Sequence, residues 1–269
     1  MERLREFRSS FWYYDFFGYM LPGFFFICLF IIDYDSCTLM RYNTGHPEGL
    51  FNIHDEPNIH FKLEYLFDFL TWKTVSDIKF TSVFMLILFC YVLGHILSAI
   101  SSFFIERLFN QGALGFPSEN LLNSEVKKNC LQRLFSNYTR SYPTEYILKF
   151  KDKYEKRFGH KIENKDTFWL CFAEITSKSP MGFNRVIHFV NLYGFTRNIA
   201  GAFFTYIVLR LLAWKVIDSK VDIYTVIILV SYLIFGLIMT KNYLKLFQRQ
   251  CNELYYHFYS MQTDCNQNN

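Results

Sequence analysis

The chain has 269 residues, of which 51% are hydrophobic and 20% aromatic, and its formal net charge is +4. This length excludes two large independent globular domains. The seven cysteines contain no CxxC pair, which excludes a paired-cysteine metal site. The apolar residues gather in long blocks separated by charged stretches. This distribution is typical of a membrane protein and not of one large soluble core.

Four apolar blocks are long enough to cross a bilayer of roughly 30 Å at ~1.5 Å per residue. They run from about residue 11 to 32, 80 to 104, 192 to 214 and 223 to 240. The first contains Asp15 near its start and Pro22-Gly23 inside it, which predicts a bend. The fourth is uncharged and gives the clearest signal. No small-residue cleavage site follows the first block, so we interpret it as a span and not as a removable signal peptide.

The positions of Lys and Arg predict the orientation of these spans. Residues 105–191 contain fourteen Lys and Arg residues, whereas residues 33–79 contain four against eight acidic residues. Both tails are basic as well. We therefore expect a multipass protein of the inner (cytoplasmic) membrane with both termini in the cytoplasm.

The predicted fold class is an all-α membrane protein with four transmembrane helices, a helical cytoplasmic insertion between spans two and three, and a C-terminal amphipathic helix. The expected divisions are residues 1–104 (tail, first two spans and outer loop), 105–191 (cytoplasmic helical domain), 192–241 (spans three and four) and 242–269 (C-terminal helix and tail). Inside the insertion, the apolar pattern predicts helices over Asn120–Phe135, Tyr142–Phe158 and Thr167–Ile175.

The C-terminal segment repeats apolar residues at a 3-4-3-4-3 spacing: Leu244, Phe247, Cys251, Leu254, Phe258 and Met261. This spacing is the seam of a coiled coil. It suits an amphipathic helix packing on its own cytoplasmic domain equally well, and the sequence leaves both alternatives open.

Enzyme motifs are absent from the sequence: there is no GxSxG, HExxH, GxxxxGK[ST] or GxGxxG. His54 and His60 flank two carboxylates in the outer loop. Pro57 lies between them and breaks the helical spacing that usually brings two such ligands to one metal. We therefore expect no metal, no cofactor and no enzymatic activity.

Small and polar residues recur at helical spacing in the second and third spans. Gly94, Ser98 and Ser102 share one face with His95 beside it, and Asn198 and Ala202 share a face in the third span. Ordinary close packing of helices explains such faces. The alternative is that they line or gate a pore, which requires several copies of so small a chain; we expect a homo-oligomer, with a tetramer as the working number.

Arg197, at the start of the third span, is the most informative single residue, because a charged side chain in lipid is costly. One interpretation is that it reaches lipid phosphates at the inner interface. The other is that it pairs with Asp15 or with a phosphate-bearing ligand, and so couples the cytoplasmic domain to the membrane helices.

Bases and aromatic residues alternate in the cytoplasmic insertion: Arg140, Tyr142, Tyr146, Lys149, Lys153, Lys156 and Arg157. Aromatic stacking combined with phosphate neutralisation suits a nucleotide or an oligonucleotide. The same residues suit a surface that rests on anionic lipid headgroups, and several of the aromatic rings must form the core of so small a domain.

Three stretches carry a resemblance to a known group of proteins. They are Tyr14-Asp15 with Tyr19–Gly23 at the first span, Leu93–Ser98 in the second, and Pro180–Arg185 with Tyr193–Asn198 ahead of the third. As an architecture, the chain resembles the small transmembrane effectors of bacterial anti-phage defence, above all the Hailong-type membrane partner of a nucleotidyltransferase. The resemblance implies an oligomeric ion-conducting effector, controlled by a nucleotide-derived signal, that depolarises the membrane and arrests growth during infection. It transfers no ligand residues.

The leading hypothesis is therefore a homo-oligomeric pore in the lipid bilayer, gated by a cytosolic nucleotide-type signal, with a cytosolic nucleotidyltransferase as a possible partner. The main alternative is a non-conducting membrane scaffold or sensor that anchors a cytosolic enzyme. A third alternative is a lipid-modifying enzyme that uses His95 or Asp15.

Overall fold

The computed structural model describes residues 15–43, 80–123, 132–133, 135, 138–162, 166–217 and 223–261, with side chains omitted for 33–43 and 80–82. Its elements are η1 (Phe16–Met20), α2 (Leu21–Asn43), α4 (Phe80–Ser101), η3 (Ser102–Leu114), α5 (Pro117–Leu122), α7 (Thr144–Phe158), α8 (Asp166–Lys178), α9 (Pro180–Ile217) and α10 (Ile223–Ser260), where η marks π-helical turns. Within these ranges every element is helical, and the all-α prediction is confirmed.

Two helical stretches are long and apolar enough to cross a membrane by length and composition: Val83–Leu122 and Ile223–Ser260. They contain the second and fourth predicted spans. The first predicted span falls on a shorter apolar helix, Phe16–Ile32, and the third falls on α9, which does not meet the same criterion. Four spans and the orientation of the termini stay predictions.

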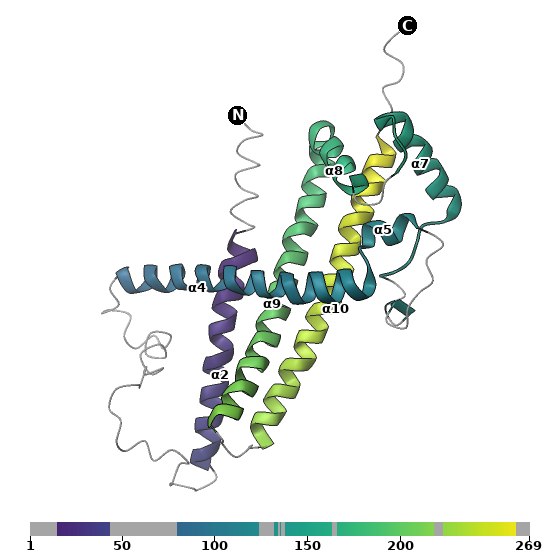
Figure 1. The fold of residues 1–269 in the computed structure, drawn as a ribbon. Coiled ribbons are helices and arrows are strands. Elements are labelled where there is room, and N and C mark those ends of the chain that lie inside the picture. Colours follow the sequence, from purple (N-terminus) through teal and green to yellow (C-terminus); the bar gives the residue numbers. More distant parts are fainter. Residues whose placement is uncertain are drawn as a thin grey trace.

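Helices α9 and α10 are the longest elements and lie side by side (Figure 1). Each has 38 residues, or ~57 Å at ~1.5 Å per residue. Helix α9 begins at Pro180, a residue suited to a first helical position, and the Ser179 hydroxyl accepts a hydrogen bond from the Gly182 N–H at 3.2 Å. Both helices continue without a break through residues 191 and 241, where the sequence places divisions between membrane and cytoplasmic parts.

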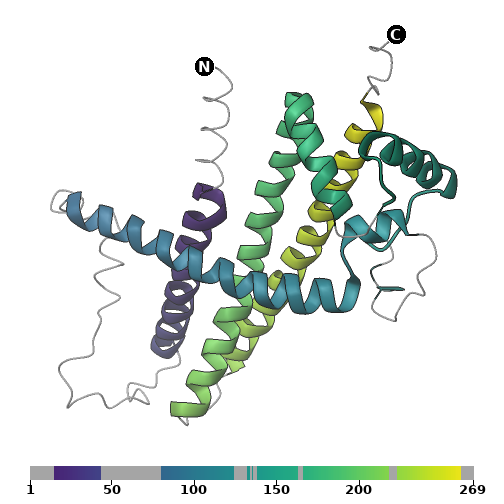
Figure 2. The same ribbon diagram turned by 45° about the horizontal axis from the view of Figure 1, so that its top comes forward.

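Helix α4 and its continuation η3 lie across α2, α9 and α10 instead of beside them (Figures 1 and 2). Two glycines permit this crossing. A Cβ on Gly94 would overlap the backbone carbonyl of Tyr19 in η1, and a Cβ on Gly23 in α2 would overlap that of Cys90 in α4. Backbone therefore rests on backbone at this crossing. Further along, Gly201 of α9 faces the Ser101 side chain, which a Cβ at Gly201 would approach to 2.6 Å.

Helices α5, α7 and α8 pack around the end of α10 that lies beyond this crossing (Figure 1). Helix α7 presents Ile147, Phe150 and Tyr154 to the shared core, and Gly159, in the left-handed region at φ 74°, ends it. The predicted helices over 142–158 and 167–175 are confirmed as α7 and α8. In the prediction over 120–135, residues 120–122 are helical as the end of α5, the extended backbone of Asn123 interrupts the predicted helix, and residues 124–131 lie outside the described ranges.

The apolar seam of the C-terminal segment is buried within its own chain. Leu244, Phe247, Cys251, Leu254 and Phe258 all belong to the core that α10 shares with the neighbouring helices, and Met261 packs against it. Of the two alternatives, packing against its own chain is therefore the one this structure has, and a coiled coil between copies is not needed to cover the seam.

Leu254→Asp is expected to unfold the part of the molecule around α5, α7 and α8. The Leu254 side chain is 0% exposed, and burying an unpaired carboxylate there costs more than about 4 kcal/mol. Thermal unfolding of the purified protein measures this loss. The matched control is Leu148→Asp on α7, where the side chain is 62% exposed and a change within about 0.5 kcal/mol is expected. Normal melting of Leu254→Asp with a smaller assembly mass would instead place the seam between copies.

Candidate functional site

A buried polar cluster lies where α4 and its continuation η3 cross α9. The Arg197 side chain forms an ion pair with Glu106, with Nη1 2.5 Å from Oε2, and its Nη2 donates to Ser98 Oγ at 3.1 Å. The Ser102 hydroxyl donates to the same Glu106 oxygen at 3.1 Å. Arg197 is only 8% exposed. A buried charge needs a partner and further hydrogen bonds, and this cluster supplies both.

Asn198 extends the cluster to a third element. Its Nδ2 donates to the Gly18 carbonyl of η1 at 2.6 Å, and its Oδ1 accepts from Ser101 Oγ at 3.2 Å and from Arg197 Nε at 3.3 Å. The three elements that meet at the crossing are thereby connected by side chains as well as by close backbone packing. Movement of any one of them breaks at least one of these bonds.

A second polar link connects η3 to α10. Asn110 is fully buried; its Nδ2 donates to the Tyr243 hydroxyl at 3.1 Å, and its Oδ1 accepts from the Tyr138 hydroxyl at 2.6 Å. Asn110 and Glu106 lie four residues apart on η3, so this element carries both polar contacts with the long helices.

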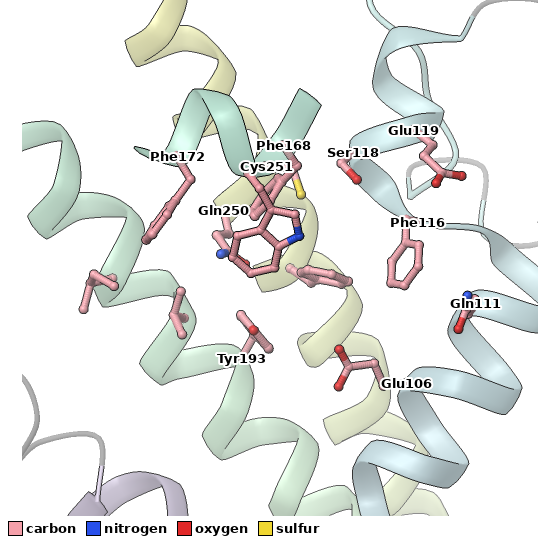
Figure 3. A pocket seen from close by; sticks show the side chains of 14 residues that line it. Glu106, Gln111, Phe116, Ser118, Glu119, Phe168, Phe172, Tyr193, Gln250 and Cys251 are labelled. Atoms are coloured by element: carbon pink, nitrogen blue, oxygen red, sulfur yellow. The ribbon is translucent and has the colours of Figure 1, made fainter. Parts of the chain in front are cut away.

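A cavity of about 540 Å³ lies beside the cluster, between η3, α5, α8, α9 and α10 (Figure 3). Its walls are mostly aromatic: Phe116, Phe168, Trp169, Phe172, Tyr193 and Phe247. The polar lining comes from Glu106, Gln111, Ser118, Glu119 and Gln250. A concave, mostly apolar space of this size with a few polar groups is the usual form of a small-molecule site. Glu106 belongs to both the cavity and the polar cluster.

The structure brings together several of the residues predicted to line or gate a pore. Ser98, Ser102 and Asn198 join the cluster around Arg197, while Gly94 makes the backbone crossing. His95 is separate from this group; it is exposed and its ring stacks on Tyr19 with centroids 3.8 Å apart. Ala202 is buried in an apolar cluster with residues of α2 and α10.

Arg197 has a different partner from the one that the coupling prediction gave it. Among the described residues its side chain bonds to Glu106, Ser98 and Asn198, and Asp15 is not one of these partners. Glu106 was missed because the sequence places the end of the second span at residue 104. The helix in fact continues as η3 to Leu114 and carries Glu106 inside it.

The alternating bases and aromatics of residues 140–157 lie on or next to α7, away from the cavity. Tyr142 donates to Asn252 Oδ1 at 2.6 Å, and Tyr146 packs against Tyr256 and Tyr259 of α10. Burial raises the pKa of both predicted tyrosines above the usual range. The two rings therefore serve the core of this part of the molecule.

The predicted bases on α7 have protein partners. Lys149 pairs with Glu145 at 2.6 Å, Lys156 with Asp152 at 2.7 Å and Arg157 with Glu174 at 2.6 Å. Lys153 donates to the carbonyls of Tyr259 and Met261 at the end of α10, and its desolvation lowers its pKa. Arg140 is exposed. None of the seven predicted ligand residues lines the cavity.

No family model matches this chain, and no curated protein or solved structure matches it. Within the described ranges, no group of three or more His, Cys, Asp or Glu residues is placed to hold a metal. His54 and His60 lie outside these ranges. The cavity and the polar cluster beside it are the features of the described residues that suit a functional site.

Proposed function

We propose that this chain is a homo-oligomeric membrane effector in which a cytosolic signal, bound in the cavity, controls a gated ion-conducting pore. The observation that carries this proposal is the position of Glu106. Its carboxylate lines the cavity and also holds Arg197 at the crossing of α4 with α9. A ligand that changes the charge balance at Glu106 acts directly on the contact between the apolar helices.

The location of the polar cluster supports a conducting role. Polar and charged side chains within apolar helices are costly in lipid and mark ion pathways and gates more often than other sites. The cavity lies at the end of α9 and α10 around which α7 and α8 pack, and residues 105–191 hold fourteen of the Lys and Arg residues. By the positive-inside rule this end faces the cytosol.

An oligomer follows from the size of the chain, because four helices of one subunit enclose no pore of useful width. The part of α4 that projects from the bundle supports contacts with lipid or with other copies, since it exposes large apolar side chains: Phe84, Met85, Ile87, Leu88 and Phe89. We propose a tetramer in the inner membrane with both termini in the cytoplasm.

Helix α4 is the proposed moving element. Helices α2 and α9 run in the same direction (Figure 1), so if both span the bilayer the chain must cross back between Asn43 and Pro180. Among the described residues of that interval, the stretch beginning at Val83 is long and apolar enough to do so. We infer that α4 spans the bilayer in one state and lies across the bundle in another.

The resemblance to Hailong-type membrane partners extends the proposal. On that basis ion flux depolarises the membrane during infection, and a nucleotide-derived signal made by a cytosolic nucleotidyltransferase also controls it. Such a signal would bind outside the cavity, because the acidic lining of the cavity disfavours phosphate groups. A non-conducting scaffold is the second candidate. It is favoured by exposed apolar side chains near the cytosolic end, Leu148, Trp169 and Met181, which suit docking of a protein partner.

Ion flux through the purified protein in liposomes tests the pore. Flux is recorded with and without short oligonucleotides, cyclic nucleotides and the organic amine named below, after protease accessibility has shown correct insertion. Flux that one of these compounds changes supports the proposal. Absence of flux under every condition overturns it and favours the scaffold.

A further inference from the structure

We propose that the cavity beside the polar cluster binds an organic cation with an aromatic or apolar body and at least one N–H donor. Only the expected consequence of binding, which is control of the pore, rests on the proposed function. The ligand class itself follows from the walls of the cavity, from its charge and from one buried amide.

The walls supply rings from four segments of the molecule. Phe168, Trp169 and Phe172 come from α8, Tyr193 from α9, Phe247 from α10, and Phe116 precedes α5 (Figure 3). Aromatic faces carry a negative partial charge, so they attract a cation that lies above them and also stack on a flat ligand. The volume of about 540 Å³ matches a small drug-sized molecule.

The charged lining is acidic. Glu106 and Glu119 both line the cavity, and no Lys, Arg or His appears among its described lining residues. Figure 3 shows the two carboxylates at different edges of the same space. Glu106 is already paired with Arg197, so the negative potential of the cavity comes from Glu119 and the ring faces, and it favours a cation over a phosphate or a carboxylate.

Gln250 narrows the ligand class further. Its side chain lines the cavity and is 4% exposed, and its Oε1 has no hydrogen-bond partner among the described residues. A buried carbonyl oxygen without a donor is destabilising, and a ligand N–H that reaches it removes this cost. The requirement for a donor favours a protonated amine over a quaternary ammonium ion.

The position of Glu106 also explains how a bound ligand could change the contact between η3 and α9. Glu106 Oε2 already binds Arg197 and Ser102. A ligand cation that approaches this carboxylate from the cavity competes with Arg197 for its negative charge. Binding is then expected to loosen the contact between η3 and α9.

Calorimetric titration of the full-length protein in nanodiscs tests the ligand class with a matched pair of probes. Tryptamine carries an indole ring, a two-carbon chain and an ammonium group, and indole-3-propionate replaces that ammonium with a carboxylate. Tryptamine is expected to bind at least about tenfold more tightly than the acid. Equal binding of both, tighter binding of the acid or of ATP, or no binding of tryptamine overturns the proposal.

Variants of the lining residues locate the binding. Glu119→Gln and Gln250→Leu are each expected to weaken tryptamine binding about tenfold, because each removes one ligand partner. Glu145→Gln is the charge-matched control, since Glu145 lies on α7 in an exposed pair with Lys149, and it should leave the affinity unchanged. Undiminished binding in both lining variants overturns the assignment to this cavity.

Thermal unfolding separates loss of a ligand contact from loss of the fold. Gln250→Leu removes a buried oxygen without a partner, so its melting temperature should stay equal or rise while its affinity falls. Tryptamine binding together with no liposome flux under any condition would leave the ligand class standing and overturn the pore. Flux controlled by a nucleotide, with no tryptamine binding, would support the pore and overturn the proposed ligand class.

Discussion

Gly94→Ala is expected to separate α4 from η1 and to lower the free energy of unfolding by about 3 kcal/mol. The added methyl group would occupy the space of the Tyr19 carbonyl, which belongs to helical backbone and has little freedom to shift. Contacts that depend on the crossing, including that of Ser98 with Arg197, should weaken at the same time. Thermal unfolding of the purified protein, followed by circular dichroism, measures the loss.

Gly112→Ala is the matched control for this substitution. Gly112 lies on η3, in continuation of α4, and a methyl group added there would have the Arg107 carbonyl oxygen as its nearest neighbour at 3.7 Å, an ordinary contact. The change should be neutral or stabilising by up to ~1 kcal/mol, because alanine favours helix more than glycine does. Equal losses in the two variants would show that the close crossing of α4 and η1 is not what makes Gly94 necessary.

Arg197→Ala is expected to destabilise the protein by about 3 kcal/mol, the lower end of the range for a broken buried ion pair. The lower end applies because the Glu106 side chain retains 27% exposure and can be partly hydrated. The variant should also lose its response to the signal in liposomes, since Glu106 would no longer connect the cavity to α9. Chemical or thermal unfolding gives the first quantity and ion flux gives the second.

Two further variants test whether the broken ion pair causes this loss of stability. The double change Glu106→Leu with Arg197→Met should recover most of the lost stability, because it removes the unpaired charge as well as the pair. Lys149→Ala breaks an exposed pair with Glu145 and should leave the melting temperature nearly unchanged, because water screens that pair. If the double variant is no more stable than Arg197→Ala, the ion pair is not the source of the loss.

Much of the helical content could be predicted from the sequence, since α7 and α8 follow from the spacing of their apolar residues. The unbroken length of α9 and α10 could not. Composition changes at the predicted membrane boundaries near residues 191 and 241, but a change from apolar to polar side chains does not end a helix when no proline or cap follows. The position of α4 could not be predicted either. Gly23 and Gly94 indicate a close crossing only once the elements that they touch are known.

The candidate site was predicted in part. Ser98, Arg197 and Asn198 stand out because they interrupt apolar spans, and the structure joins them in one cluster. Glu106 and Gln250 give no such signal, since polar residues are common in the segments where they occur. The bases and aromatics of α7 give a strong pattern, yet its aromatic rings pack on α10 and its bases pair with neighbouring carboxylates and carbonyls.

The unbroken length of α10 has a mechanical consequence. The helix extends from Ile223 to Ser260 without a proline, so it behaves as a stiff rod and not as two segments joined by a hinge. A tilt of about 5° at the end beside the cavity would displace the opposite end of a ~57 Å rod by about 5 Å. That distance is comparable to the radius of an α-helix with its side chains, so a small change at one end is enough to open or close a gap at the other.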